Sequence, residues 1–407
     1  MDRFSQFLES RIPAMQELLR DLVEIQSGTG NKAGVDTLVR HLDGYLKEHG
    51  LLTTIVGQDC AGDILIADMP GAAQAEKRIL LSGHMDTVFP ADTAFRHLTC
   101  EGDIARGPGT CDMKGGLVVG IFAMLALKEL GFVHLPVRFL FSPDEERSSR
   151  TMRAFLKNEA RSAAFALVFE MAGPENELVR TRKGKIALKV HIRGKAGHAA
   201  FVTHDKISAL LDAARKVIRL EELPALAAAS GGNSLSVNVG RLQSGTAMNV
   251  IPEEAVLEVE ARCHDAALLA RTEQAMTDIL LQPQVPGTVS TLFERVENPP
   301  LEVGSTEELY GIAASVAAEL GQTVGEDFRA GSSEACYLAA EGLPVLDGFG
   351  PLGGKDHSTE EYLLLSSLPE RAALTAGTIV KAWDRYTQGG LRPFQASHEG
   401  GIHGNHH

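Results

Sequence analysis

Histidine and carboxylate side chains recur in this sequence directly after segments that are typical of buried strands. Four such clusters are SGHMD at 82–86, GPGTCDMKGG at 107–116, PDEE at 143–146 and FE at 169–170, and a late glycine-rich loop, GGKDHS at 353–358, adds a further histidine. Ligands of open α/β sheets bind beyond the carboxyl ends of the strands. We therefore expect the four clusters to converge on one rim, which the loop of His357 could also reach.

The residue types in these clusters are those that bind zinc. Imidazole and carboxylate groups ligate Zn²⁺ at about 2.0–2.2 Å. Two histidines and three carboxylates could hold two ions if one carboxylate bridges them. Asp112 is the best bridging candidate, because the glycines around it let the backbone come close. Asp86 lies two residues after His84, and on extended chain it could accept the second ring N–H of that histidine.

Glu145 and Glu146 are adjacent carboxylates that would repel each other unless their roles differ. Side chains alternate along extended chain, so one carboxylate could face the ions and the other the attacking water. A carboxylate beside an activated water can take its proton and later protonate a leaving amine. Two ions about 3.5–4 Å apart can generate a bridging hydroxide and stabilise a tetrahedral oxyanion. The pattern thus predicts hydrolysis of an amide bond.

Each cluster also has an ordinary interpretation when it is taken alone. A His-x-Asp pair is usually a capping or surface pair, an Asp-Glu-Glu run is usually a solvated loop, and a glycine-rich stretch can be any tight turn. The joint pattern is more specific, because all four clusters share one structural location.

The elements that must position these residues follow two different patterns. Apolar strands at 63–67, 78–82, 137–141 and 164–169 alternate with helices, including one at 114–130, which predicts an α/β layer with a largely parallel sheet. After residue 182 the pattern becomes α+β, with strands at 185–193, 235–239 and 255–261 and helices at 207–220 and 266–281. We predict a discontinuous metal-binding domain at 1–182 and 296–388, an inserted domain at 183–295, and a flexible tail at 389–407.

Composition excludes several classes of protein. The 407 residues are 44% hydrophobic and carry a net charge of −14, so a large core is possible, and a nucleic-acid or anionic-membrane partner is not expected. Neither a secretory h-region nor an apolar run of about 18 residues is found. Five cysteines without a CxxC pair argue against a disulfide framework. We expect a cytoplasmic protein.

The order GHMDTV, GPGTCDMKGG, DEE, Glu170 and His357 resembles the dinuclear zinc carboxypeptidase and aminoacylase family, and by motif its glutamate carboxypeptidases in particular. The resemblance covers roughly residues 5–385. It implies a catalytic domain with a mixed sheet, interrupted by a ferredoxin-like α+β lid domain through which two subunits form a homodimer.

The resemblance also assigns a role to each residue of the predicted metal site. One zinc ion would be bound by His84 and Glu170 and the other by Glu146 and His357, with Asp112 bridging them, Glu145 as general acid/base and Asp86 orienting His84.

Three residues of the inserted domain match substrate-binding positions of the family. His198, in GKAGHA at 194–199, would polarise the scissile carbonyl in the neighbouring subunit, although it could also be a turn histidine on the surface. Asn249 and Arg262 would bind the substrate carboxylate, and Arg262 could equally be a strand-edge arginine. One departure concerns the hinge after the lid. Asn298 stands where glutamate carboxypeptidases carry an arginine, which removes a reason to expect a preference for C-terminal glutamate.

Two further positions bear on this comparison with the family. Arg180, Arg182 or Lys183 could replace the missing hinge arginine. Glu334 stands where many members of the family have Asp, which should alter the packing of its loop rather than the chemistry.

These observations favour a metallo-carboxypeptidase that acts on a small peptide or N-acyl amino acid with a free carboxylate. An N-acyl-amino-acid deacylase of the acetylornithine deacetylase or desuccinylase type is the alternative enzyme. A non-catalytic binding protein on the same scaffold would have lost a ligand or the base, and here all five ligand positions and Glu145 carry competent residue types. Two Zn²⁺ per subunit are expected, although Co²⁺ or Mn²⁺ suits the same ligands.

Overall fold

The computed structural model describes residues 1–73, 75–201, 206–229 and 235–394, and the chain in it divides into two compact units. The first unit comprises Met1–Arg182, Leu301–Arg329 and the described residues from Ser333 onward. The inserted unit comprises Lys183–Pro300 together with Ala330–Ser332. Each unit has its own hydrophobic core.

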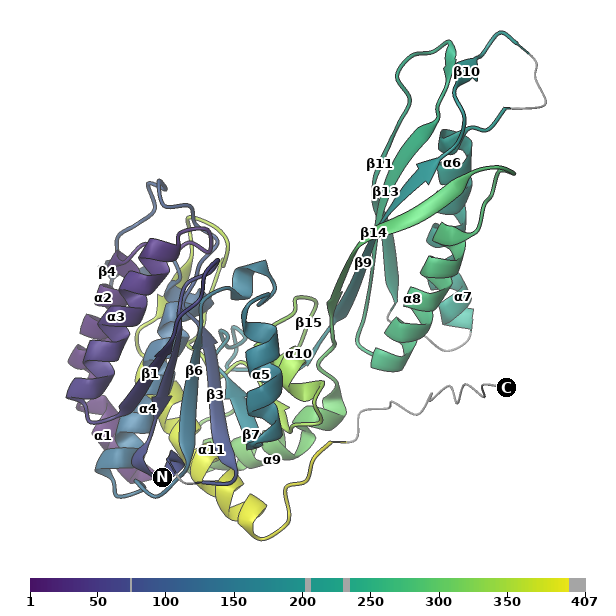
Figure 1. Ribbon diagram of the computed structural model, residues 1–407. Coiled ribbons are helices and arrows are strands. Elements are labelled where there is room, and N and C mark those ends of the chain that lie inside the picture. The colour runs from purple at the N-terminus through teal and green to yellow at the C-terminus, as the bar shows by residue number, and fades with distance from the viewer. Residues whose placement is uncertain (74, 202–205, 230–234, 395–407) are drawn as a thin grey trace. The chain divides into compact units, whose positions relative to one another are not determined.

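The first unit is built on a six-stranded mixed sheet in the order β1-β2-β6-β3-β7-β16 (Figure 1). The strands are β1 (Leu52–Val56), β2 (Ile64–Asp68), β6 (Val137–Ser142), β3 (Arg78–His84), β7 (Ala163–Val168) and β16 (Val345–Leu346). The three neighbours β6, β3 and β7 run parallel, and β16 runs parallel to β7, whereas β1 and β2 pair antiparallel. The central strands are apolar along nearly their whole length because both faces of the sheet are covered.

Helices cover the two faces of this sheet. Alternate strand residues such as Leu81 and Phe139 pack in one core with α1 (Asp2–Glu9), α2 (Ile12–Glu24), α3 (Lys32–Glu48), α4 (Gly115–Glu129), α9 (Val303–Glu319) and α11 (Ser367–Thr387). Leu80 and Leu140 point to the other face and pack with α5 (Met152–Arg161) and α10 (Glu334–Ala339). The predicted α/β layer with a mixed sheet is therefore confirmed.

Helix α4 is the central core helix of this unit. With the preceding turn it forms a stretch, Thr110–Glu129, that is long and apolar enough to cross a membrane by length and composition alone. However, 94% of its most apolar window is buried inside the protein. A helix that is apolar on all sides is expected where other elements surround it.

Two smaller sheets complete the first unit. Strands β17 (Gly353–Gly354), β18 (Tyr362–Leu364), β5 (Ile104–Arg106) and β4 (Thr99–Glu101) form one antiparallel sheet, and the loop between β17 and β18 carries His357. The other sheet joins β8 (Leu178–Arg182) in parallel with β15 (Glu326–Arg329).

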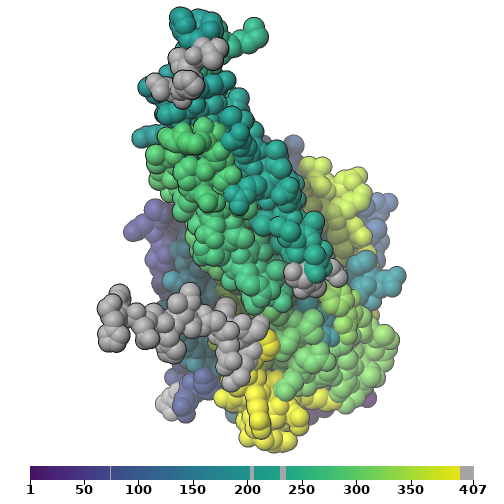
Figure 2. Space-filling view, turned by 90° about the vertical axis from the view of Figure 1, so that its right-hand side faces the viewer, coloured from purple at the N-terminus to yellow at the C-terminus, as the bar shows by residue number. Residues whose placement is uncertain are grey.

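The inserted unit is a four-stranded antiparallel sheet covered by helices on one face. The strand order is β11 (Ser236–Ser244), β13 (Glu254–Cys263), β9 (Gly184–Arg193) and β14 (Val289–Asn298). The alternation in β9 buries Ile186, Leu188 and their neighbours against α6 (Ala209–Glu221) and α8 (Ala266–Leu281). Figure 2 looks onto these helices, with α6 in teal beside α8 in green, and the short α7 (Leu223–Ala229) follows α6. The predicted α+β insert is confirmed.

The two predicted ends of the discontinuous domain need adjustment. Strand β14 was not predicted, and because it completes the inserted sheet, the inserted unit continues to Pro300 rather than to residue 295. The predicted flexible tail begins too early. Leu391 is buried, and the Phe394 N–H donates to the Gly342 carbonyl at 2.9 Å. The rest of that tail, 395–407, lies outside the described residues.

Candidate active site

Three predicted metal-binding segments lie at the carboxyl ends of adjacent parallel strands. His84 is the last residue of β3 and pairs in register with Ser142 of β6. Glu145 and Glu146 follow β6, and Glu170 follows β7. Parallel strands end at the same edge of a sheet, so these side chains are brought together by the topology alone.

His84 is buried between two aspartates. Its Nε2 lies 2.9 Å from Asp112 Oδ1, and its Nδ1 lies 2.9 Å from the backbone oxygen of Asp86 and 3.4 Å from the Asp86 carboxylate. Burial alone would lower the pKa of His84, but hydrogen bonds with Asp112 and Asp86 outweigh it and raise this pKa well above its usual value. Asp86 thus orients the ring, chiefly through its carbonyl and less through the predicted carboxylate contact.

Asp112 presents its two carboxylate oxygens to two different histidines. Oδ1 faces His84, and Oδ2 lies 3.2 Å from His357 Nε2. Burial would raise the pKa of Asp112, but these two histidines hold it far below its usual range. This is the geometry expected of a bridging carboxylate.

The loop of Asp112 is held by a carboxylate that the sequence analysis did not single out. Glu361, which is 1% exposed, accepts backbone N–H groups from Gly109 at 3.0 Å, Cys111 at 2.9 Å and Asp112 at 3.1 Å. Burial raises the pKa of Glu361 to about 7, although the backbone donors oppose the shift. Its contact partners are about 250 residues away in sequence, so no local pattern indicates this role.

Glu145 and Glu146 do not lie on extended chain as predicted, because Glu145–Arg147 forms a turn of 3-10 helix. Both carboxylates nevertheless reach the site. Glu146 Oε2 lies 3.2 Å from His357 Nε2, and Glu145 groups with His84 and Glu170, their ligand atoms within 4.8 Å of one another. The carboxylate of Asp86 accepts the backbone N–H of Glu145 at 3.0 Å and of Glu146 at 3.2 Å. Asp86 therefore positions both glutamates as well as His84.

Glu170 completes the cluster on the side of Glu145. Its Oε1 lies 3.9 Å from His84 Nε2, and its Oε2 lies 4.0 Å from Arg182, which also pairs with the buried Asp347 at 2.7 Å. Burial and the nearby Asp112 raise the pKa of Glu170 to about 8, against the opposing effect of Arg182. Asp347 was not predicted as a site residue, and Arg182 was considered only as a substitute for the hinge arginine, since an ion pair between distant segments has no local signature.

All five predicted metal-binding residues thus meet, and their chemistry fits cations. Carboxylates crowd around two imidazoles, and the buried Glu146 Oε1 has no hydrogen-bond partner among the described residues. Burial also raises the pKa of Glu145 well above its usual value. A cation bound here would offset the repulsion between these carboxylates, and because ligands must be deprotonated, its binding would release protons from the histidines. His84, Asp112, Glu146, Glu170 and His357 are the donors that would hold it.

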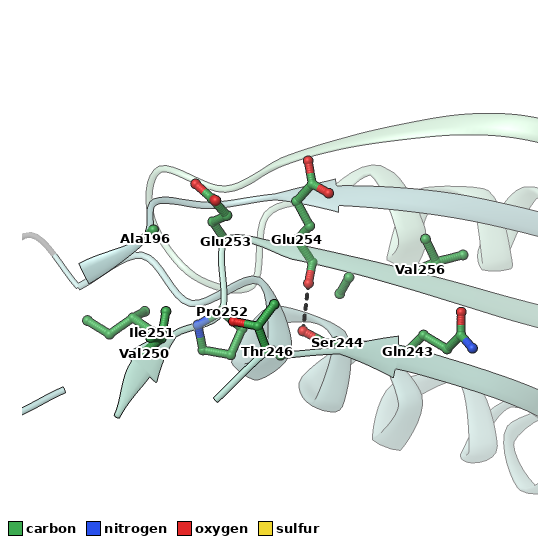
Figure 3. A pocket seen from close by; sticks show the side chains of 12 residues that line it. Ala196, Gln243, Ser244, Thr246, Val250, Ile251, Pro252, Glu253, Glu254 and Val256 are labelled. Carbon is green, nitrogen blue, oxygen red and sulfur yellow. Dashed lines mark hydrogen bonds between the residues drawn. The ribbon is translucent and has the colours of Figure 1, made fainter. Parts of the chain in front are cut away.

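In the inserted unit, the structure brings two of the three predicted substrate-binding residues together. The two-stranded ladder of β10 (Gly197–His198) and β12 (Val250–Ile251) places His198 beside the Asn249 segment, whose carbonyl accepts the Ala199 N–H at 2.9 Å. A pocket with a volume of ≈ 300 Å³ lies next to this ladder. It is lined by Ala196 and by residues 243–246 and 250–256 (Figure 3).

Arg262 does not join them within this unit. It lies one residue before the end of β13, at the opposite end of that strand from Glu254, and pairs with Glu260 at 2.9 Å. Strand β13 is also internal to the sheet, so Arg262 is not a strand-edge arginine.

Two of the residues considered as substitutes for the missing hinge arginine, Arg180 and Arg182, have other partners. Arg180 pairs with Glu307 and Glu326 and lies over the ring of Tyr310, and Arg182 pairs with Asp347. Asn298 is buried at the end of β14. Glu334 lies under the site, where it accepts a hydrogen bond from Ser82 Oγ at 2.5 Å. The contacts of Arg180 and Arg182 therefore give no support for either residue as a substitute for the hinge arginine.

The α/β fold and its buried donor cluster define a metallohydrolase. Residues 80–381 match the family described as peptidase family M20/M25/M40. Carboxypeptidase G2 of Pseudomonas sp. (strain RS-16) is 31% identical over 389 residues, which covers 90% of this chain and 89% of that protein. The chain therefore belongs to peptidase family M20/M25/M40, and it is an enzyme that hydrolyses amide bonds with the help of metal.

Solved structures show the same fold. A tripeptidase from Staphylococcus aureus has a TM-score of 0.72 at 21% identity, covering 91% of this chain and 98% of that one. A Bacillus subtilis protein, described as a dinuclear metal-binding peptidase of the M20 family, has a TM-score of 0.65 at 16% identity, covering 92% and 99% of the two chains.

Proposed function

We propose that this protein is a dinuclear zinc carboxypeptidase that acts, as a cytoplasmic homodimer, on small peptides or N-acyl amino acids with a free carboxylate. The observation that carries the proposal is the position of Asp112, whose two oxygens face His84 and His357 separately. His84 and Glu170 would bind one ion, Glu146 and His357 the other, and Asp112 both. Two such ions, when bound, polarise a carbonyl and make a water molecule more acidic.

Glu145 is the general acid/base of this proposal. It lies within the cluster but is the carboxylate left over when the other donors are assigned to two ions. Its raised pKa, which is caused mainly by burial, suits a group that takes a proton from the attacking water and passes it to the leaving amine. The turn that holds Glu145 is fixed by Asp86, so the carboxylate is preorganised.

The inserted unit would supply substrate binding. The family resemblance gives His198 the role of polarising the scissile carbonyl in the partner subunit, and gives Asn249 and Arg262 the role of binding the substrate carboxylate. The similarity to carboxypeptidase G2 supports the proposal that this protein is a carboxypeptidase. Because Asn298 stands at the position of the hinge arginine, the proposal includes no preference for substrates with a C-terminal glutamate. Five free cysteines, two of them exposed, support a reducing compartment.

A substrate panel with one variant tests the proposal. Zinc-loaded protein should release the C-terminal amino acid from dipeptides or N-acyl amino acids, and a chelator should abolish release. Glu145→Gln should keep its metal content, measured by atomic emission, but lose a factor of about 10²–10⁴ in kcat, since it lacks the proton-transfer group. Unchanged turnover in this variant would remove Glu145 from its role, and a wild type inactive on the whole panel would contradict the proposed function.

A further inference from the structure

The first unit also contains a cavity, which lies beside the metal-binding carboxylate Glu146. It has a volume of ≈ 550 Å³ and is lined by two loops, 28–31 and 87–91, and by Glu146 and Arg147. Cavities of about 300–1,000 Å³ are typical of small-molecule sites. Glu146 forms part of its wall, so the cavity and the metal site share one side chain.

The walls of this cavity are fixed by hydrogen bonds. The Thr29 N–H donates to the Thr87 carbonyl at 3.0 Å, and the Thr87 N–H donates to the Ser27 carbonyl at 3.0 Å. The Thr29 hydroxyl donates to Asp86 Oδ2 at 2.7 Å, the same carboxylate oxygen that accepts the Glu146 N–H. The cavity and the metal-binding turn are therefore held by one side chain, so their relative geometry is preorganised.

The lining of the cavity combines apolar surface with one cation. Val88, which is 40% exposed, lies with Phe89 and Pro90 along one loop. Arg147 supplies the only positively charged side chain among the lining residues. Its guanidinium lies against Gly30, where an added Cβ would come 3.0 Å from Nη2, and it makes no ion pair within the described parts of the chain. An apolar group that ends in an anion would complement this lining.

The positions of the two glutamates indicate which part of the substrate enters the cavity. Glu145, which must reach the leaving amine, groups with His84 and Glu170. Glu146, which lines the cavity, also groups with His84, but its other neighbours are Asp112 and His357 rather than Glu170. The leaving amino acid therefore belongs on the Glu145 side, and the acyl group belongs on the Glu146 side.

We propose that this cavity is the acyl-side subsite, and that Arg147 makes it select acyl groups with an apolar segment and a terminal carboxylate. The inference rests on the proposed function and narrows its substrates to N-acyl amino acids of the dicarboxylic type. An arginine that binds a carboxylate at the far end of the acyl chain would discriminate against a neutral group of the same shape.

Paired substrates of equal size test the selection. The N-glutaryl and N-glutaramoyl derivatives of one amino acid, the one that wild type releases fastest, differ only in whether a carboxylate or an amide ends the acyl chain. Wild type should have a kcat/KM about tenfold or more higher for the glutaryl compound, as expected for one charge-assisted contact near solvent. A ratio near one in an otherwise active wild type would overturn the inference but leave the proposed function intact.

Two variants and one control locate the effect. Arg147→Gln should bring the ratio to within about twofold of one, mainly by lowering kcat/KM for the glutaryl compound. The matched control Arg150→Gln, an exposed arginine that does not line the cavity, should keep the wild-type ratio. Ala91→Trp, at an exposed lining position, should slow both long acyl substrates but not the N-acetyl derivative. If Arg147→Gln retains the wild-type ratio, or Ala91→Trp slows all three compounds equally, the cavity is not the acyl subsite.

Discussion

In the first unit, further contacts hold the candidate residues in place, whereas in the inserted unit the candidates His198 and Asn249 are exposed. His84 is fixed by the Asp86 carbonyl, the Asp112 loop by Glu361, and the turn of Glu146 by the Asp86 carboxylate. His198 is exposed, and its Nδ1 accepts the nearby Ala200 N–H at 3.1 Å.

This difference separates two functions of the candidate residues, which are metal binding in the first unit and substrate binding in the inserted unit. Mutually held carboxylates and imidazoles, most of them buried or half-buried, are a preorganised metal site whose geometry belongs to one unit. Exposed residues on a short ladder contribute only when a substrate or another protein surface meets them. Changes in the first unit should therefore alter metal affinity and stability, and changes in the inserted unit should alter turnover alone.

Within the inserted unit, the largest effect is expected for His198→Ala. If His198 polarises the scissile carbonyl, its loss should lower kcat/KM about 10²-fold, the usual cost of one oxyanion donor. Metal content and the thermal unfolding midpoint should not change, because the side chain is exposed. Steady-state kinetics, metal analysis and calorimetry would measure the three quantities. His191→Ala, another histidine of the same unit, is the control and should stay fully active. Loss of metal from the His198 variant would contradict the separation of the two units.

In the first unit, Glu361→Gln should weaken metal binding while leaving the donors in place. The carboxylate accepts three backbone N–H groups, and an amide would offer one oxygen and point its own N–H groups at the remaining donors. We expect a loss of about 10–100-fold in metal affinity, as for other residues that orient metal ligands. Competition with a chromophoric chelator measures this affinity.

The adjacent Glu360 provides a matched control for that experiment. It is exposed and pairs with Lys355 rather than with the Asp112 loop. Glu360→Gln should bind metal as tightly as wild type. Equal affinities in the two variants would show that the contacts of Glu361 do not position Asp112.

The parts of the molecule that could be predicted are those with a local signature. Strands β3, β6 and β7 are continuous apolar runs, and polar residues follow each of them directly, so both the sheet and the meeting of His84, Glu146 and Glu170 follow from short segments. The glycines around Asp112 indicated its bridging role, and family motifs then assigned His84 and Glu170 to one ion and Glu146 and His357 to the other.

The parts that could not be predicted depend on distant contacts or on weak patterns. Glu361 is an ordinary loop glutamate in sequence, and its role exists only because the fold brings it to Gly109 and Asp112. The turn at Glu145 ends the extended chain early because the Asp86 carboxylate accepts the backbone N–H groups of Glu145 and Glu146. Strand β14 was missed because it lies at the edge of its sheet, where Val289 and Phe293 are 64% and 56% exposed and no clear apolar alternation results.

The smallest effect concerns the pH dependence of stability in the first unit and arises from Glu334. Burial raises the pKa of this carboxyl to about 7 from 4.5, although the hydroxyls of Ser142 and Ser82 oppose the shift. The folded protein therefore holds this proton more tightly than the unfolded chain. The resulting stabilisation is complete below about pH 4.5 and is lost as the pH rises through about 7.

Glu334→Gln should remove this dependence, because an amide of similar shape is neutral at every pH. Relative to wild type, the free energy of unfolding of the variant should rise between pH 5 and pH 8 by on the order of 1–2 kcal/mol. Urea unfolding of chelator-treated protein at both pH values measures it, and Glu308→Gln, at an exposed position of α9, should track wild type. Because Glu334 contacts β3 two residues before His84, while the inserted unit has its own core, amide exchange should report the change in β3 and not in β9. Equal changes in both strands would mean that the two units unfold as one, and that the contrast between them is confined to their side chains.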